Sequence, residues 1–261
     1  MYYKNKIVWI TGASTGVGEH LAYAFSEAGA KLIISARRLS ELERVKNNCK
    51  KETEIRILPL DLEKHDELPE KAKEAENFFG QIDILFHNGG ISQRSLLKDT
   101  SFDVDKRLMN INYFGSVCIT KAVLPGMIKN GGGQIAVMSS LTGKFGAPLR
   151  SAYAASKHAL HGFYDTLRAE LYRENISVTI ICSGYIRTNI AVNALIENGQ
   201  ANNNNDSGIK NGMNPKVFAK KALADISKKK QEVLYGGSER FGVYIKRFFP
   251  LLFSKIIRNK V

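Results

Sequence analysis

The strongest constraint on the fold is a regular alternation between short apolar runs and longer segments with helical periodicity. Six runs are rich in β-branched residues and apolar at successive positions, as is typical of parallel strands buried on both faces. They span 7–10, 32–35, 55–58, 82–86, 134–138 and 177–181. The intervening segments predict helices over 18–28, 39–50, 65–79, 114–129 and 152–174. This order predicts an α/β fold in which a doubly wound parallel β-sheet carries helices on both faces.

The alternation runs through the chain without an internal linker, which predicts a single domain over residues 1–261. One stretch departs from it. Residues 189–214 contain ANNNNDSG and have no pattern that builds a core. This stretch is either an ordinary surface loop or a lid over the substrate, since it follows a strand whose end faces the expected site. We predict a substrate lid that is poorly ordered without ligand.

A glycine-rich turn follows the first predicted strand, with the sequence TGASTGVG at 11–18. Its glycines permit a tight turn and let the backbone approach a pyrophosphate, while the helix that begins there supplies free N–H groups and a positive dipole end. Between a strand and a helix, this motif predicts a Rossmann-type dinucleotide-binding turn rather than a simple connection. The residues expected at the cofactor are Gly12, Ser14, Thr15, Gly16, Val17 and Gly18.

The end of the second strand indicates which dinucleotide is bound. A carboxylate there would bind the ribose 2′-OH of NAD, but this chain has Arg37 and Arg38. Guanidinium groups form bidentate, charge-assisted hydrogen bonds with phosphate. The pair therefore favours NADP(H) over NAD(H), although one of the two arginines could be a solvated charge at the helix entry.

A tyrosine and a lysine stand four residues apart in YAASK, at the start of a predicted helix. This spacing places Tyr153 and Lys157 on one helix face. An unperturbed tyrosine titrates near ~10, and a neighbouring ammonium together with an oxidised nicotinamide would lower that pKa. The pair predicts a general acid and base that exchanges a proton with a substrate oxygen.

With these motifs in place, the chain resembles the short-chain dehydrogenase/reductase family over essentially its whole length. Further matches are Asp61 in LPLDL, HNGG at 87–90, Asn112 in NINYFG, the serine pair at 139–140, and the segment from Ser183-Gly184 to Thr188. The runs NGGISQRSL, SARRLSELERVK and YAASKHAL look closest to its dehydrogenase/reductase member 7-like branch.

The resemblance implies roles for these positions. Ser140 would hold the substrate oxygen, Tyr153 would be the acid and base, and Lys157 would depress the pKa of Tyr153 and bind the nicotinamide ribose. Asn112 would hold a water that relays protons to solvent. The remaining implied cofactor contacts are Asp61, Leu62, Asn88, Gly89, Gly90, Gly184, Ile186 and Thr188.

Two departures from the family pattern stand out. His87 replaces an asparagine, and we predict a structural role for it. Ser183 replaces a proline, so the loop after the sixth strand loses rigidity. Beside them, Gln93 and Arg94 follow HNGG at the expected rim of the site. They are candidates to bind the substrate, but capping a turn is an equal alternative.

The net charge of +13 indicates anionic ligands or surfaces. The segment 237–261 is basic and amphipathic, and it could touch a membrane at its periphery or pack on the core or a second subunit. Basic residues are otherwise scattered and no binding motif for nucleic acid is present, so we expect none as a partner. No apolar run reaches the ~20 residues that span a bilayer. The N-terminus has no leader pattern, and three isolated cysteines predict reduced thiols in a cytoplasmic protein without a metal site.

Together these features predict an NADP(H)-dependent oxidoreductase that transfers hydride between the nicotinamide and a carbonyl or secondary alcohol substrate. We expect a homo-oligomer, either a dimer or a tetramer. The lipophilic character of the basic C-terminal segment favours a lipophilic substrate. The alternative is a membrane-associated or regulatory NADP-binding protein with little catalytic activity. The presence of serine, tyrosine and lysine together argues for the enzyme.

Overall fold

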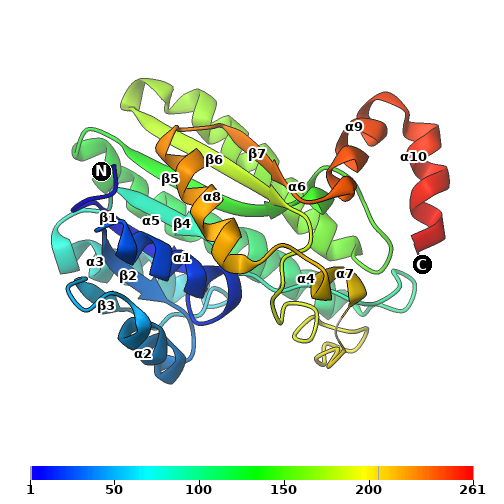
Figure 1. The fold of residues 1–261 in the computed structure, drawn as a ribbon, viewed down its shortest axis with the longest axis horizontal. Helices are drawn as coiled ribbons and strands as arrows, with labels where there is room; N and C mark the ends of the chain where they lie inside the picture. Colours follow the sequence, from blue (N-terminus) through cyan, green and yellow to red (C-terminus); the bar gives the residue numbers. More distant parts are fainter. Residues whose placement is uncertain (1, 205, 261) are drawn as a thin grey trace.

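Seven parallel strands form one sheet in the order β3-β2-β1-β4-β5-β6-β7 (Figure 1). The computed structural model describes residues 2–204 and 206–260. The order reverses between β1 and β4, and in a doubly wound sheet ligands bind outside the carboxyl ends of the strands at this point. The strands are β1 Ile7–Thr11, β2 Lys31–Ser35, β3 Ile55–Ile57, β4 Ile84–His87, β5 Gly133–Ser140, β6 Ile176–Ser183 and β7 Glu232–Tyr235.

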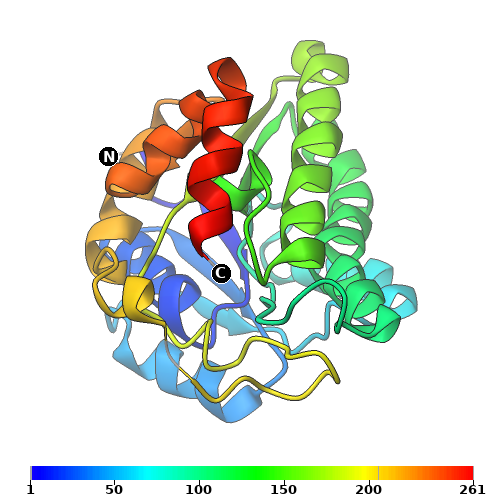
Figure 2. The same cartoon turned by 90° about the vertical axis from the view of Figure 1, so that its right-hand side faces the viewer.

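Helices cover both faces of the sheet, and two apolar cores lie between the layers (Figure 2). Alternate residues of each strand pack into opposite cores: Trp9 and Ile33 lie in one core, and Ile10 and Ile34 lie in the other. This two-sided burial explains why the strands read as continuous apolar runs. One layer consists of α1 Gly16–Glu27, α2 Leu39–Asn48 and α8 Pro215–Ser227, and the other of α3 Leu68–Phe79, α4 Phe102–Met109, α5 Gly115–Lys129 and α6 Ser151–Glu170.

The predicted doubly wound α/β fold is confirmed, with differences at the ends of elements. The helix predicted over 65–79 begins as a short 3-10 turn, His65–Glu67, and the one predicted over 152–174 ends in another, Tyr172–Glu174. Strand β7 and helix α8 were not predicted. β7 has only four residues at the sheet edge and follows a run of lysines, so its apolar signal is weak.

Helices α4 and α5 are joined by a π-helical turn, Asn110–Phe114, into one helix over 102–129. Within the described residues this is the one helix whose length and composition would suffice to cross a membrane, which the sequence reading did not identify. Its apolar residues Ile119, Val123 and Met127 pack into the core beneath α3 and α6. A core helix of a layered fold has the same composition.

Two segments extend beyond the carboxyl end of the sheet. The stretch after β6 contains the short helix α7 Ser207–Lys210 and otherwise lacks regular helix or strand. The chain then returns through α8 and β7 and ends in α9 Phe241–Phe248 and α10 Pro250–Ile257, with 3-10 turns at Ser238–Arg240 and Arg258–Lys260. Helices α9 and α10 form a hairpin that projects from the body (Figures 1 and 2).

Candidate functional site

A cleft of about 1440 Å³ runs along the carboxyl ends of β1, β4, β5 and β6. Sites for drug-sized molecules are typically about 300–1,000 Å³, so this cleft has room for a dinucleotide and a second small molecule. It gathers nearly all the predicted site residues from segments far apart in the sequence. The exceptions are Gly18, Gln93 and Asn112, which do not line the cleft.

The glycine turn of 11–18 forms one end of the cleft. Gly12 and Gly16 have φ angles of +67° and +60°, a conformation that strongly favours glycine. A Cβ atom at Gly12 would lie 2.6 Å from the Cα of Gly89, so the β1 turn touches the turn after β4. The N-terminus of α1 opens directly onto this turn, as binding of a pyrophosphate requires.

Gly18 packs the helix rather than facing the cleft. A Cβ atom there would lie 2.2 Å from the carbonyl oxygen of Gly12 and 2.5 Å from Nδ2 of Asn88. Gly18 does not line the cleft, so the structure does not support a direct contact between Gly18 and the cofactor. It permits α1 to approach the turn, which holds the contacting residues in position.

Asn88 joins the ends of β1 and β4. Its side-chain amide donates to the carbonyl oxygens of Thr11 and Gly12 at 3.2 and 2.9 Å. The Thr11 hydroxyl in turn accepts from the backbone N–H groups of Asn88 and Gly89 at 3.2 Å each. These bonds fix the floor of the cleft at the switch point of the sheet.

Arg37 and Arg38 border the same end of the cleft and are exposed. Neither forms an ion pair with a carboxylate of the described residues, whereas nearby Arg44 is paired with Glu19 and Glu41. Two free guanidinium groups beside the turn can bind a phosphate. Asp61 and Leu62 line the cleft close by, with the Asp61 carboxylate accepting from the backbone N–H of Glu63 at 3.1 Å.

Ser140, Tyr153 and Lys157 meet at the other end of the cleft. Ser140 ends β5, and its hydroxyl accepts from the N–H and the hydroxyl of Thr142 at 3.1 and 2.9 Å. Tyr153 lies in the first turn of α6. Burial raises the pKa of Tyr153 above 10, while a hydrogen bond with Ser140 and the charges of Arg94 and Arg150 oppose this shift.

Lys157 lies one turn further along α6 and is almost fully buried. Its Nζ donates to the carbonyl oxygen of Met138 at 2.7 Å and lies 5.7 Å from the centroid of the Tyr153 ring. Burial lowers the pKa of Lys157 to about 8. In the protein alone burial raises the pKa of Tyr153, and the depression of that pKa expected from Lys157 stays a prediction.

Asn112 lies in the π-helical turn, where such irregularities often accompany functional sites. Its Oδ1 accepts from the N–H of Ile91 at 2.8 Å, and its Nδ2 donates to the carbonyl of Ile91 and the hydroxyl of Ser156, each at 3.0 Å. These bonds occupy the side-chain amide, which positions the 88–91 turn against α6. The water that Asn112 is expected to hold in the proton path stays a prediction.

Gln93 was expected at the substrate rim, and this expectation is wrong. The residue is fully buried, and its Oε1 accepts from the backbone N–H of Ala152 at 3.0 Å and of Tyr153 at 3.4 Å. Its Nε2 donates to three hydroxyl groups, those of Ser95, Thr100 and Ser151. Gln93 thus caps the N-terminus of α6, where the first N–H groups of a helix have no partner within it.

Arg94 does line the cleft. It lies beside Arg150 and Asp206, two residues that the sequence analysis did not single out. Arg94 and Arg150 both contact Oδ2 of Asp206, at 3.1 and 3.0 Å. Asp206 belongs to the stretch 189–214, so this pair of arginines holds it against the body. Arg150 could have been noticed as a cation three residues before Tyr153, but no local pattern links it to Asp206.

The stretch 189–214 borders the substrate end of the cleft through Asn189, Asn193 and Ile209. It is held by backbone hydrogen bonds: Leu195 donates to Ser92 and accepts from Arg94, both at 2.8 Å. Ala191 and Ala194 are buried. Its position matches that of the predicted lid, while its opening and order without ligand remain predictions.

His87 is structural, as predicted. It is buried in β4, and its Nε2 lies 2.8 Å from the hydroxyl of Thr120, between the sheet and α5. Burial lowers its pKa to about 3, so the ring is neutral at physiological pH.

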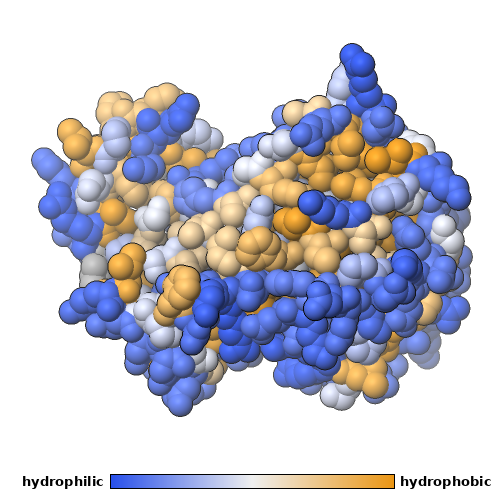
Figure 3. All heavy atoms as spheres, turned by 180° about the vertical axis from the view of Figure 1, so that it is seen from behind, coloured by the Kyte–Doolittle hydropathy of each residue, from blue (hydrophilic) through white to orange (hydrophobic). Residues whose placement is uncertain are grey.

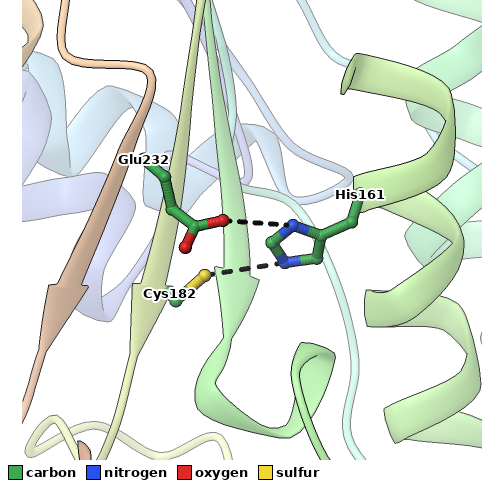
Figure 4. A group of neighbouring side chains, drawn as sticks. All are labelled: His161, Cys182 and Glu232. Atoms are coloured by element: carbon green, nitrogen blue, oxygen red, sulfur yellow. Dashed lines mark hydrogen bonds and ion pairs between the residues drawn. The ribbon is translucent and has the colours of Figure 1, made fainter. Parts of the chain in front are cut away.

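His161, Cys182 and Glu232 form a group behind the cleft, shown in Figure 4. The two ring nitrogens of His161 face opposite partners: Nε2 lies 3.5 Å from the Cys182 sulfur and Nδ1 lies 3.6 Å from the Glu232 carboxylate. One ligand atom from each of the three residues lies within 4.8 Å of the other two. Burial lowers the pKa of His161 to about 4 and raises that of Cys182 to about 12, and Lys144 pairs with Glu232. We interpret the group as packing beneath α6.

Comparison with known proteins agrees with this geometry. A family model described as short chain dehydrogenase matches residues 6–198. The chain is 41% identical over 261 residues to a Drosophila melanogaster protein, dehydrogenase/reductase SDR family protein 7-like, covering 98% of this chain and 80% of that one. It is 48% identical over 195 residues to Homo sapiens dehydrogenase/reductase SDR family member 7, covering 72% of this chain and 58% of that one.

Solved structures confirm the fold. A short-chain dehydrogenase/reductase from Burkholderia phymatum in complex with NAD has a TM-score of 0.85 at 20% identity, covering 97% of this chain and 96% of that one. An alcohol dehydrogenase from Thermococcus sibiricus, complexed with 5-hydroxy-NADP, has a TM-score of 0.76 at 23% identity, covering 90% of this chain and 97% of that one. The family match, the relatives and the cleft agree, and the chain belongs to the short-chain dehydrogenase/reductase family of oxidoreductases with a Rossmann-type NAD(P)-binding fold.

Proposed function

We propose that this protein is an NADP(H)-dependent oxidoreductase that interconverts a carbonyl group and a secondary alcohol on a lipophilic small molecule. The observation that carries the proposal is the meeting of Ser140, Tyr153 and Lys157 at one end of a cleft whose other end is the glycine turn. Hydride and proton transfer need both parts within one site.

The residues at the turn fit a dinucleotide. Gly12 and Gly16 leave space where a side chain would stand, and the N-terminus of α1 favours a pyrophosphate. Arg37 and Arg38 would bind a 2′-phosphate, which supports NADP(H) over NAD(H). Further contacts are proposed for Asp61, Asn88, Gly90, Gly184, Ile186 and Thr188. When bound, the nicotinamide supplies or accepts the hydride.

The side chains of the protein would handle the oxygen and its proton. The Ser140 hydroxyl would donate a hydrogen bond to the substrate oxygen, and the Tyr153 phenol would give it a proton during reduction. Because burial raises the pKa of Tyr153, the phenol carries its proton at neutral pH, which suits reduction. In the reverse direction the positive charges of Lys157 and of the oxidised nicotinamide would favour the phenolate.

The substrate end is mostly apolar, which supports a lipophilic substrate. Its wall includes Phe145, Leu149, Leu195 and Phe253, with Arg94 as a polar element beside them. An apolar wall with few polar groups selects by shape and burial. The stretch 189–214 would act as the lid over this end.

We further propose a homo-oligomer formed through the long helices over 102–129 and 151–170. Phe102 and Phe114 are exposed on the first of these. Figure 3 shows this side of the molecule, where apolar surface runs between charged borders. Exposed apolar surface of this extent commonly marks an interface. A cytoplasmic location also stays a prediction.

The test is oxidation of NADPH against a panel of aldehydes and ketones, with NADH as the control. We expect turnover with NADPH and a lower rate with NADH. The Tyr153→Phe variant should bind NADPH with near-normal affinity and lose at least about 100-fold in kcat, because it cannot transfer the proton. Binding of NADPH without turnover of any carbonyl by the unaltered protein would instead favour a regulatory NADP-binding protein.

A further inference from the structure

The C-terminal hairpin formed by α9 and α10 leaves large apolar side chains without a partner in the described chain. Its inner face is packed: Phe253 is buried and stacks on Phe145 with ring centroids 5.0 Å apart. Its outer end is not. Phe248, Phe249 and Leu251 are 69%, 63% and 81% exposed. These three residues lie next to one another at the bend between the helices, so the hairpin presents a continuous apolar tip.

Cations lie along both helices of the hairpin, and Lys246 and Arg247 are next to the tip. Lys246, Arg247, Lys255 and Arg258 are exposed on the hairpin, and residues 241–261 contain no aspartate or glutamate. Within the described part of the chain, no cation of the hairpin forms an ion pair with an acidic residue. Seen from behind, the hairpin carries orange hydrophobic and blue hydrophilic groups side by side (Figure 3). An apolar tip among unpaired cations is the pattern of segments that insert shallowly into anionic lipid surfaces.

The same hairpin forms part of the cleft. Gly242, Ile245 and Ile256 line its substrate end, as do Phe253 and Ile257. Whatever surface the tip contacts therefore lies beside the place where a substrate would enter. The charges also argue against a second copy of this chain as the occupant, because a symmetric contact would set cations of one tip against those of the other.

We propose that the tip of the α9–α10 hairpin docks the protein on the surface of a bilayer that contains anionic lipid. Phe248, Phe249 and Leu251 would enter the interface, and the four surrounding cations would lie at the headgroups. The docked protein would then open its cleft toward the membrane. This last consequence rests on the proposed function, but the docking itself does not.

The test uses the full chain and vesicles of phosphatidylcholine, with or without about 30% phosphatidylglycerol, in a flotation assay. We expect binding to the anionic vesicles only, and loss of that binding at high salt, because salt screens exposed charges. Leu251→Asp should abolish flotation. The double variant Lys246→Gln/Arg247→Gln should lower vesicle affinity about 30-fold, since each cation near an anionic surface contributes several-fold.

Matched variants serve as controls. Leu97→Asp introduces the same change at another exposed leucine, and Lys220→Gln/Lys221→Gln removes an adjacent exposed pair on α8. Both should float like the unaltered protein, and the circular dichroism of all variants should be unchanged. Absence of flotation, equal binding to both kinds of vesicle, or normal flotation of Leu251→Asp would overturn the proposal.

Two further measurements separate the alternatives. If Leu251→Asp converts an oligomer into a monomer while the unaltered protein does not float, the tip binds a second copy and the proposal is wrong. NADPH binding measured by fluorescence reports on the proposed function independently. Docking without NADPH binding would overturn the proposed function alone, and NADPH binding without docking would overturn this inference alone.

Discussion

The two ends of the cleft are built in different ways. The nucleotide end consists of backbone turns in such close contact that a single added carbon at Gly12 or Gly18 would collide with main-chain atoms. The substrate end is closed by the 189–214 stretch, a shared ion pair and a projecting hairpin. Few substitutions fit where main-chain segments pack against each other. Side chains that make contacts from a long loop can be replaced more readily. We therefore expect substitutions to be poorly tolerated at the glycine turn and better tolerated at the opposite end of the cleft.

The largest effect should come from Gly18→Ala at the nucleotide end. The added carbon would lie 2.2 Å from the Gly12 oxygen, so α1 or the turn must move. We expect NADPH affinity to fall at least about 100-fold and the free energy of unfolding to fall by about 1–3 kcal/mol. Gly162→Ala is the control, because no atom lies within 4 Å of its added carbon. It should stabilise helix α6 by about 0.5–1 kcal/mol. Normal NADPH binding by Gly18→Ala would remove the contrast between the two ends.

Lys157 lies beside Tyr153 at the end of the cleft opposite the glycine turn, and its burial predicts a dependence of stability on pH. Its pKa falls from 10.5 in the unfolded chain to about 8 in the folded one. The unfolded chain therefore holds more protons between these pH values, so the free energy of unfolding rises with pH through this window. The gain attributable to Lys157 is on the order of 3 kcal/mol at most.

Urea denaturation at pH 7 and at pH 9.5 measures this gain. The difference in unfolding free energy between the unaltered protein and Lys157→Met should shift in favour of the unaltered protein at the higher pH. The exposed Lys220→Met variant should show no such shift. A gap that stays constant with pH would mean that Lys157 is hydrated and carries an ordinary pKa.

Substitution of Arg37 and Arg38 should have a smaller effect, confined to the nucleotide end of the cleft. Arg37→Gln/Arg38→Gln should lower affinity for NADPH by about 10- to 100-fold, because charge-assisted hydrogen bonds to phosphate contribute about 1.5–3 kcal/mol. Affinity for NADH should hardly change. Arg56→Gln removes an exposed charge outside the cleft and serves as the control. Equal losses for both nucleotides would show that the pair contributes only a general positive field.

The smallest effect is expected at the substrate end. Asp206→Asn removes the charge that Arg94 and Arg150 share through side chains that are only 10%, 17% and 25% exposed. It should raise KM for carbonyl substrates by a few-fold, because the 189–214 stretch is held less firmly at the substrate end. Protease cleavage within 189–214 should become faster, and NADPH affinity should not change. Asp165→Asn, which breaks a surface pair with Arg168, is the matched control. A fall in NADPH affinity would show that the two ends are coupled through this ion pair.

The sequence predicted the fold because it follows local rules, and the same rules predicted residues at the proposed nucleotide end that line one cleft. The glycine turn, Arg37 and the Tyr153–Lys157 spacing are each readable within a few residues. The substrate end could not be predicted in the same way. Gln93 sits next to Arg94 in the chain, yet one is buried as a helix cap and the other lines the cleft. Which side of the backbone faces the cleft depends on the bridge to Leu195, a contact about a hundred residues away in sequence.

Gln93 links the 189–214 stretch to Tyr153. Its main chain pairs with Leu195 of the 189–214 stretch, while its side-chain oxygen accepts from the N–H of the very residue that carries the phenol. A substrate that displaces Leu195 would therefore also displace Gln93, whose side chain is hydrogen-bonded to the backbone N–H of Tyr153. The orientation of the Tyr153 hydroxyl toward the substrate oxygen would then differ between substrates of different shape. Selectivity among substrates would appear in kcat as well as in binding affinity.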